Sequence, residues 1–234
     1  MLLDYLKTSP STFVIPLAYL IDILLVVKLR NMLDISKKTH AVLVGVIMTT
    51  AGRYAISFFY QLSGILMPDI LHSGIFGLFC LGVLFIYVFS CIIRKPVGKM
   101  LDVFAIIMSV YGALNRLNCV IIGCCGGVDL WGNLQWPNRM LEIAFFAAAF
   151  FVLMQYKEKT QFHGQLFLWL MTGYGVFRFL NEFLSRGQVL FCGLKIAHIW
   201  AFLCSAIGFS IYSEMILRVE KNSHRKKNGG KLKC

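Results

Sequence analysis

Seven long apolar runs, separated by short charged connections, dominate this sequence. They cover residues 12–29, 41–62, 74–93, 101–122, 140–156, 165–184 and 194–217. A helix that crosses a membrane needs roughly 20 mostly apolar residues, because the hydrocarbon core offers the backbone no hydrogen-bond partner. We therefore predict an all-α, polytopic membrane protein of about seven transmembrane helices.

The composition excludes an ordinary soluble domain. Hydrophobic residues make up 58% of the chain and charged residues 15%, whereas about a quarter of residues are charged in soluble domains. The net charge of +12 lies in loops and at the C-terminal end, a pattern that indicates membrane topology rather than nucleic-acid binding. We expect one transmembrane helical domain over residues 1–220 and a basic cytoplasmic tail over 221–234. The start, MLLDYLKTSP, lacks a cationic region, so the first apolar run is expected to be a retained helix.

The distribution of Lys and Arg predicts the orientation. Alternate connections and the C-terminal tail carry 16 of the 23 basic residues. The connections on the other side carry only Lys7, Arg139, Arg186 and Lys195. Because basic loops remain in the cytoplasm, the N-terminus is predicted outside and the C-terminus cytoplasmic.

Three further arginines, Arg53, Arg116 and Arg178, lie inside apolar runs. An arginine at the centre of a membrane helix costs about 2.5–3.5 kcal/mol, so it normally faces the bundle interior or a watery cavity. The predicted orientation places Arg116 and Arg178 in the outer half of the membrane and Arg53 near mid-depth. Structural ion pairs are one interpretation; three arginines on helices that run the same way favour an anionic ligand.

The segment GYGVFRFLNEF around Arg178 carries an ordered polar set. Tyr174, Arg178 and Glu182 are spaced i, i+4, i+8, so a helix stacks them about 6 Å apart on one face. Glu182 can orient the guanidinium and leave other donors for a phosphate. A satisfied internal network is the alternative.

A second polar set lies in the run NRLNCVIIGCCGG. Asn115, Arg116, Asn118 and Cys119 are costly on a membrane helix unless they line a wet or ligand-filled cleft. The GCCGG that follows is predicted to end the helix, and its glycines allow backbone N–H groups to approach a ligand.

Two more residues are expected at this outer level. His72 precedes the third apolar run and is a candidate base, although a histidine there can simply cap a helix. Glu142 opens the fifth run, where the helix dipole alone also favours a carboxylate. No role is assigned to three isolated intramembrane residues: Asp22, His198 and Glu214.

The cysteines give a weaker signal. Cys124 and Cys125 are adjacent, and the sequence has neither a CxxC nor a histidine pair that would indicate a zinc site. Thiol redox chemistry at this pair remains an alternative, and no metal or cofactor is expected. The thiols inside apolar runs are read as small hydrophobes: Cys80, Cys91 and Cys204.

At these residues the chain resembles the prolipoprotein diacylglyceryl transferases of bacterial inner membranes. HSGIFG is similar to the HGGLIG block of the family, WPNRMLE to YPTQLYE, and GYGVFRFLNEF to YGxxRFxxEF. NRLNCVIIGCCGG stands where the signature GRxxNFxNxExxG is expected. The resemblance places Arg116 and Gly127 on the signature's arginine and closing glycine, and His72 on the family's histidine.

The sequence departs from that signature at several positions. Asn115 replaces a glycine, Cys119 and Ile122 replace two asparagines, and Cys124 replaces a glutamate. Tyr19 is only a loose match to the family's first-helix tyrosine. The GCC form resembles a divergent branch of the family.

The resemblance implies an enzyme that moves diacylglycerol from phosphatidylglycerol to the thiol of a prolipoprotein signal segment in the bacterial plasma membrane. The implied catalytic residues are His72, Arg116, Tyr174 and Arg178. Together with the polar residues of the apolar runs, this gives the expected substrate-binding residues: Arg53, Asn115, Asn118, Gly127, Glu142 and Glu182.

Three alternatives remain. A family paralogue that uses another lipid or acceptor is favoured by the altered signature. A membrane thiol oxidoreductase would use Cys124 and Cys125. A transporter or lipid-binding scaffold is disfavoured, because no inverted repeat is visible.

Overall fold

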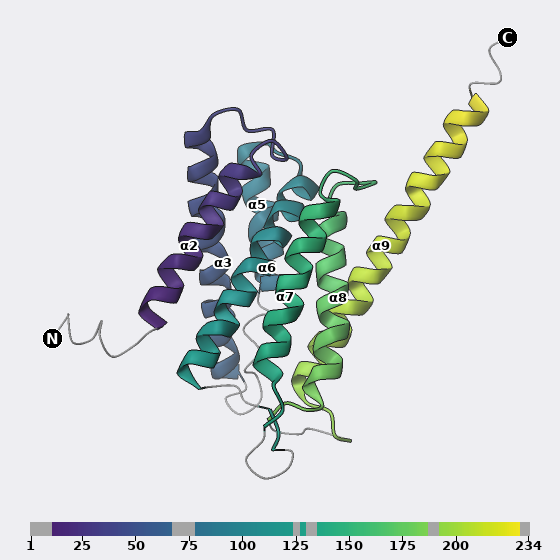
Figure 1. Ribbon diagram of the computed structural model, residues 1–234. Helices are drawn as coiled ribbons and strands as arrows, with labels where there is room; N and C mark the ends of the chain where they lie inside the picture. Colours follow the sequence, from purple (N-terminus) through teal and green to yellow (C-terminus); the bar gives the residue numbers. More distant parts are fainter. Residues whose placement is uncertain (1–10, 67–77, 124–126, 130–134, 187–191, 230–234) are drawn as a thin grey trace.

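The chain forms an up-and-down bundle of helices (Figure 1). The computed structural model describes residues 11–66, 78–123, 127–129, 135–186 and 192–229, apart from some side chains within the helices, that of Arg53 among them. Over these ranges there are seven α-helices: α2 (Ser11–Lys28), α3 (Lys38–Leu66), α5 (Val83–Ile93), α6 (Val97–Ile122), α7 (Asn138–Tyr156), α8 (Gln165–Glu182) and α9 (Ile196–Gly229). A π-helical turn, η1 (Leu78–Gly82), leads into α5, and the only extended pairings in this part of the chain are two isolated bridges. The predicted all-α fold is confirmed.

Each predicted apolar run coincides with a helix. Three helices exceed their predicted runs by four residues or more. α3 extends beyond 41–62 at both ends, α6 begins at Val97 instead of residue 101, and α9 continues through most of the predicted tail. Three of the described helices, α6, α7 and α9, are long and apolar enough to cross a membrane. Seven crossings and the orientation remain predictions.

Helix α6 lies at the centre of the bundle. It packs against α2, α5, α7 and α8, while α8 pairs along its length with α9. Figure 1 shows the described parts of the connections alternating between two ends. Residues 29–37, 94–96 and 157–164 lie at the upper end, and residues 127–129, 135–137, 183–186 and 192–195 lie at the lower end. These two ends match the two sets of loops distinguished by their basic residues.

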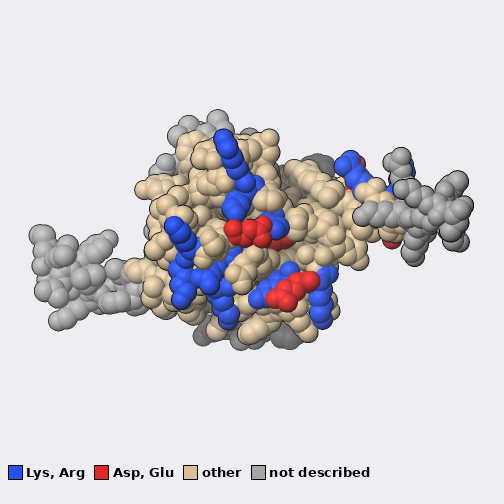
Figure 2. Space-filling model, turned by 90° about the horizontal axis from the view of Figure 1, so that it is seen from above, with Lys and Arg blue, Asp and Glu red and all other residues tan. Residues whose placement is uncertain are grey.

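Basic side chains gather on the upper end, which Figure 2 views directly. Two contacts there bind the connection 29–37 to the start of α6 and the residues before it: Lys99 Nζ lies 2.5 Å from Asp34 Oδ2, and Lys95 Nζ donates to the Asp34 carbonyl at 2.8 Å. Hydrogen bonding from the Lys99 ammonium holds the pKa of the Asp34 carboxyl below its usual value. The charge asymmetry expected from the sequence is therefore a property of one face of the bundle.

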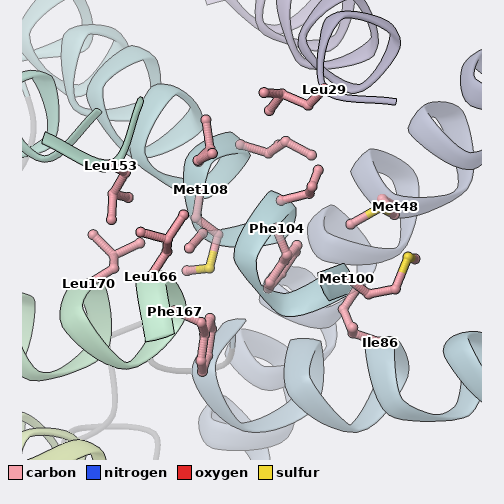
Figure 3. Close-up of a cluster of buried hydrophobic side chains, with 14 of the residues drawn as sticks. Leu29, Met48, Ile86, Met100, Phe104, Met108, Leu153, Leu166, Phe167 and Leu170 are labelled. Carbon is pink, nitrogen blue, oxygen red and sulfur yellow. The ribbon is translucent and has the colours of Figure 1, made fainter. Parts of the chain in front are cut away.

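The core is built on the middle of α6, where Met100 to Met108 are almost all buried. Figure 3 shows Phe104 and Met108 among side chains from the neighbouring helices. Lower on α6, Gly112 permits a close approach of α7, because a Cβ there would lie 2.8 Å from the Phe146 ring. A side chain at this position would push α7 away.

A buried carboxylate fixes the start of α8 against α6. Asp102 accepts hydrogen bonds from the backbone N–H groups of Gly164 and Leu166, both at 2.8 Å, and of Phe167 at 3.4 Å. The first N–H groups of a helix have no partner within the helix, so an acceptor from another element satisfies them. Asp102 thereby fixes the position of α8 relative to α6 along the bundle axis, and both helices extend to the opposite end of the bundle.

Candidate functional site

Three predicted site residues lie at similar depths from the lower end of the bundle. Arg116 lies about 9 Å along the axis from the end of α6, and Arg178 lies about 6 Å from the end of α8. Glu142 lies about 6 Å inside α7. Because the three helices pack side by side, these side chains can meet.

They meet at the carboxylate of Glu142. Arg116 Nε lies 2.5 Å from Glu142 Oε2, and Arg178 donates from Nη1 to Oε1. The Glu142 side chain is 2% exposed, and the two guanidiniums are 13% and 11% exposed. Glu142 lies one turn inside α7, beyond its first turn, so its partners are the two arginines rather than the helix dipole.

Arg178 is also held from its own helix. Its Nη2 lies 2.6 Å from Glu182 Oε2, which confirms the contact predicted from the i, i+4 spacing. Glu182 Oε1 in turn lies 4.0 Å from Lys195 Nζ. We name these five residues the ion cluster: Arg116, Glu142, Arg178, Glu182 and Lys195. Its three cations and two carboxylates leave a formal charge of +1, which favours one monoanionic ligand.

Tyr174 lies one turn deeper than Arg178, as predicted. It is fully buried, its ring stacks on Phe146 with centroids 5.1 Å apart, and Phe79 packs against it at 5.9 Å. Arg116 and Glu142 are both close enough to interact electrostatically with its hydroxyl. Tyr174 therefore forms the inner wall of the ion cluster.

Amide side chains join α7 to α8 at the lower end. Asn181 donates to the side-chain oxygen of Asn138, and its own oxygen accepts from Trp136 Nε1 at 3.2 Å. Arg139 donates to the Cys119 carbonyl of α6 at 3.1 Å. The sequence alone did not indicate a role for these residues at the site, because each is of a type common in loops and at helix ends.

Glycines shape the connection that follows α6. Gly123 ends the helix with φ of 80°, so the predicted break at GCCGG is confirmed. Gly127 forms an isolated bridge with Ser185, and a Cβ on it would lie 2.4 Å from the Trp136 carbonyl oxygen. Only glycine fits at that position, next to the end of α8 that carries Glu182.

The remaining predicted residues are placed in part. Asn115 and Asn118 lie on α6 and are partly buried, and Asn118 Oδ1 has no hydrogen-bond partner among the described residues. Arg53 belongs to α3, but its side chain lies outside the described residues, as do His72 and the Cys124–Cys125 pair. The convergence of His72 with the two arginines stays a prediction.

The structure adds Lys195, which the sequence analysis used only as a topology signal. It lies just before α9, is almost completely buried, and its backbone N–H donates to His198 Nδ1 at 3.0 Å. Burial lowers the pKa of the Lys195 ammonium. The sequence did contain a signal for Lys195: only four basic residues are predicted on this side, so a basic residue there is unusual.

A separate cavity lies between α2, α3 and α6. It encloses about 260 Å³ of space that is partly open to the outside. Fully buried Asp22 lines it, and along α6 its nearest lining residue, Tyr111, is about 7.5 Å from Arg116. The cavity is thus distinct from the ion cluster. Over the described residues no group of three or more His, Cys, Asp or Glu side chains is placed to hold a metal ion.

The family of the chain follows from comparison with known proteins. The family described as prolipoprotein diacylglyceryl transferase matches residues 12–213, which include all seven described helices in whole or in large part. The chain belongs to this family. The resemblance inferred from the sequence motifs is confirmed, and the prolipoprotein diacylglyceryl transferases are transferases.

A curated relative supports this assignment over a shorter stretch. The chain is 27% identical over 95 residues to a protein of Campylobacter hominis named phosphatidylglycerol–prolipoprotein diacylglyceryl transferase. The match covers 38% of this chain and 34% of the relative. The family is thus shown across most of the chain, while this relative is matched over about a third of its length.

Proposed function

We propose that this member of the family transfers diacylglycerol from phosphatidylglycerol to a cysteine thiol of a prolipoprotein signal segment. The name of the relative from Campylobacter hominis contains both the donor lipid and the acceptor class. We further propose that it acts as a multi-pass protein of the bacterial plasma membrane, with the ion cluster toward the outer leaflet.

The observation that carries the proposal is the meeting of Arg116 and Arg178 on one carboxylate. Guanidiniums bind phosphate oxygens through paired N–H groups. Arg178 has five N–H donors, more than its contacts with Glu142 and Glu182 occupy. The surplus charge of the ion cluster matches the single negative charge of a phosphodiester. We expect the lipid phosphate to bind here in exchange for part of the Glu142 contacts.

The chemistry would proceed as a displacement at carbon. The acceptor thiol gives its proton to a base, for which His72 is the candidate, and the sulfur attacks the glycerol carbon that carries the phosphate ester. A C–S bond forms as the C–O bond breaks, and glycerol phosphate leaves with the bonding electrons. Arg116 and Arg178 would stabilise the charge that grows on the departing phosphate.

The other expected residues would bind and orient the lipid. Tyr174 would close the inner side of the headgroup site, and Glu182 would aim Arg178. The proposed lipid-binding set also includes Arg53, Asn115, Asn118, Gly127 and Glu142. No metal or organic cofactor enters this chemistry.

The test is an assay of the purified protein with phosphatidylglycerol and a peptide that carries the signal-segment cysteine. The proposal predicts a thioether-linked diacylglyceryl peptide, detected by mass spectrometry, and release of glycerol phosphate. Arg178→Ala should abolish both products, while Cys124→Ser with Cys125→Ser should retain them. A folded protein that binds phosphatidylglycerol and forms no thioether would contradict the proposal.

A family paralogue with another lipid or acceptor is the second candidate, favoured by the altered signature. Cys119 and Ile122 replace two asparagines on the last turns of α6, on the same helix as Arg116. Complementation of a bacterial strain depleted of its own transferase distinguishes the two. Restored lipoprotein modification supports the first candidate, and failure of a well-expressed protein to restore it supports the paralogue.

A further inference from the structure

The ammonium group of Lys195 joins the start of α9 to the end of α8 at the lower end of the bundle. Its Nζ donates to the Glu182 carbonyl at 2.8 Å and to the Ser185 carbonyl, and it lies 4.0 Å from the Glu182 carboxylate. The two carbonyls belong to the end of α8 and the residues just beyond it. An ammonium has three donors; two of them bind these carbonyls, and the Glu182 carboxylate lies beside the group as an ion-pair partner.

The placement of this lysine serves more than helix capping. A cation at the C-terminus of a helix is favoured by the helix dipole, but a solvated lysine achieves that without losing its hydration. Lys195 is instead almost completely buried, and its ammonium lies beside the carboxylate that holds Arg178. Without Lys195, the formal charge of the ion cluster would fall from +1 to zero.

The same contacts also fix the connection after α6. Ser185 forms the bridge with Gly127, and the Val128 N–H donates to the Leu184 carbonyl at 2.9 Å. By holding the Ser185 carbonyl, Lys195 couples the glycine-bearing connection to Glu182. A substitution of this lysine should therefore alter both the orientation of the Arg178 guanidinium and the position of the connection that contains Gly127.

We propose that Lys195 is a positioning residue that holds Glu182 toward Arg178 and supplies the surplus positive charge by which the site prefers an anionic phospholipid headgroup. The inference rests on the proposed function for its catalytic consequences. Its electrostatic part concerns lipid selection and can be tested without turnover.

The first measurement is lipid binding by protein in nanodiscs that contain phosphatidylglycerol or phosphatidylcholine. Wild type should prefer phosphatidylglycerol, and Lys195→Met should lose about 10–100-fold of that preference, as expected for a lost hydrogen-bonded charge. Lys195→Arg should restore most of it. Lys99→Met is the matched control, because Lys99 also pairs with a carboxylate but lies at the opposite end; it should bind as wild type does.

The second measurement is the pH profile of transfer, together with KM and kcat. The charged groups around Lys195 are Glu182 and Arg178 of α8, with His198 of α9 beside it. Because burial lowers the pKa of Lys195, wild-type activity should decline at a lower alkaline pH than an ordinary lysine would give. Lys195→Arg should remove that decline, and Lys195→Met should raise KM for phosphatidylglycerol more than it lowers kcat.

The outcomes separate this inference from the proposed function. If wild type prefers phosphatidylglycerol but forms no thioether, the proposed function fails. The role of Lys195 in lipid selection is then still tested by comparing the lipid preferences of wild type and Lys195→Met. If a folded Lys195→Met variant keeps the wild-type lipid preference, the inference fails. It fails equally if Lys195→Arg restores thermal stability but leaves the lipid preference at the Lys195→Met value, or if the activity of Lys195→Arg declines at the same alkaline pH as that of wild type.

Discussion

Asp102 and Glu142 are both buried carboxylates on neighbouring helices, yet their partners differ in kind. Asp102, toward the basic end, is satisfied by three backbone N–H groups at the start of α8. Glu142, toward the opposite end, is satisfied by the side chains of Arg116 and Arg178. Backbone donors are fixed by the helix they begin, whereas guanidiniums can turn to a new acceptor.

Under the proposed function, the basic end of the bundle is structural and the opposite end, with the ion cluster, is reactive. A carboxylate held by backbone groups has no exchangeable partner, so Asp102 can only determine how α6 and α8 are placed. A carboxylate held by two arginines marks a site where a phosphate can replace it. Four substitutions test this proposed division.

The first prediction concerns the reactive end. Arg178→Ala removes the contacts with Glu142 and Glu182 together, and transfer activity should fall by about 10³-fold, because stabilisation of the leaving phosphate is lost. Arg178→Lys should lower transfer activity by about 10–100-fold, since an ammonium cannot replace the paired N–H donors of a guanidinium. Rates are measured on variants of confirmed folding. The control is Arg186→Ala, at an exposed ion pair with Asp129, and its transfer activity should stay near that of wild type. An equal loss of activity in this variant would contradict a specific role for Arg178.

The second prediction concerns the structural end. Asp102→Ala leaves three backbone N–H groups without their acceptor, and stability should fall by about 2–4 kcal/mol. Thermal unfolding in detergent, followed by fluorescence, measures the loss. Activity per folded molecule should stay close to wild type at low temperature. A specific loss of activity in folded Asp102→Ala would mean that the two ends are not separable.

The third prediction tests the packing that brings the arginines together. Gly112→Val places atoms against the Phe146 ring, which stacks on Tyr174. Stability should fall by about 1–3 kcal/mol from overpacking, and activity should fall with it because α6 and α7 separate near the ion cluster. Gly173→Ala is the control, since its Cβ would meet only Phe145 at 3.9 Å. Full activity in a stably folded Gly112→Val variant would contradict this dependence.

The fourth prediction concerns the exposed pair at the basic end. The pKa of Asp34 is lowered in the folded protein by the hydrogen bond from Lys99, so the pair stabilises the fold above the unfolded pKa of Asp. That contribution is lost as the pH falls through the lowered folded pKa. Lys99→Met should flatten the acid side of the stability profile slightly and leave transfer unchanged. Unfolding measured from pH 3 to pH 6 detects the difference.

The sequence predicted the helices and part of the site. The apolar runs located the helices because membrane length and backbone satisfaction leave few alternatives. The Arg178–Glu182 pair followed from helical spacing alone. The break at Gly123 followed from the glycines after Cys119.

The rest depends on contacts between distant segments. The meeting of Arg116 and Arg178 on Glu142 requires the rotation of three helices about their axes, which apolar runs do not determine. The role of Asp102 was missed because its partners lie more than 60 residues away in the chain. Lys195 was missed because its partners are mostly backbone carbonyls, which no residue type reveals.

The most direct test of the central claim is a structure of the protein in nanodiscs that contain phosphatidylglycerol. We expect the lipid phosphate within hydrogen-bond distance of both Arg116 and Arg178, with at least one of their contacts to Glu142 exchanged for a phosphate oxygen. A bound lipid whose phosphate lies elsewhere, with both arginines still paired to Glu142, would contradict it.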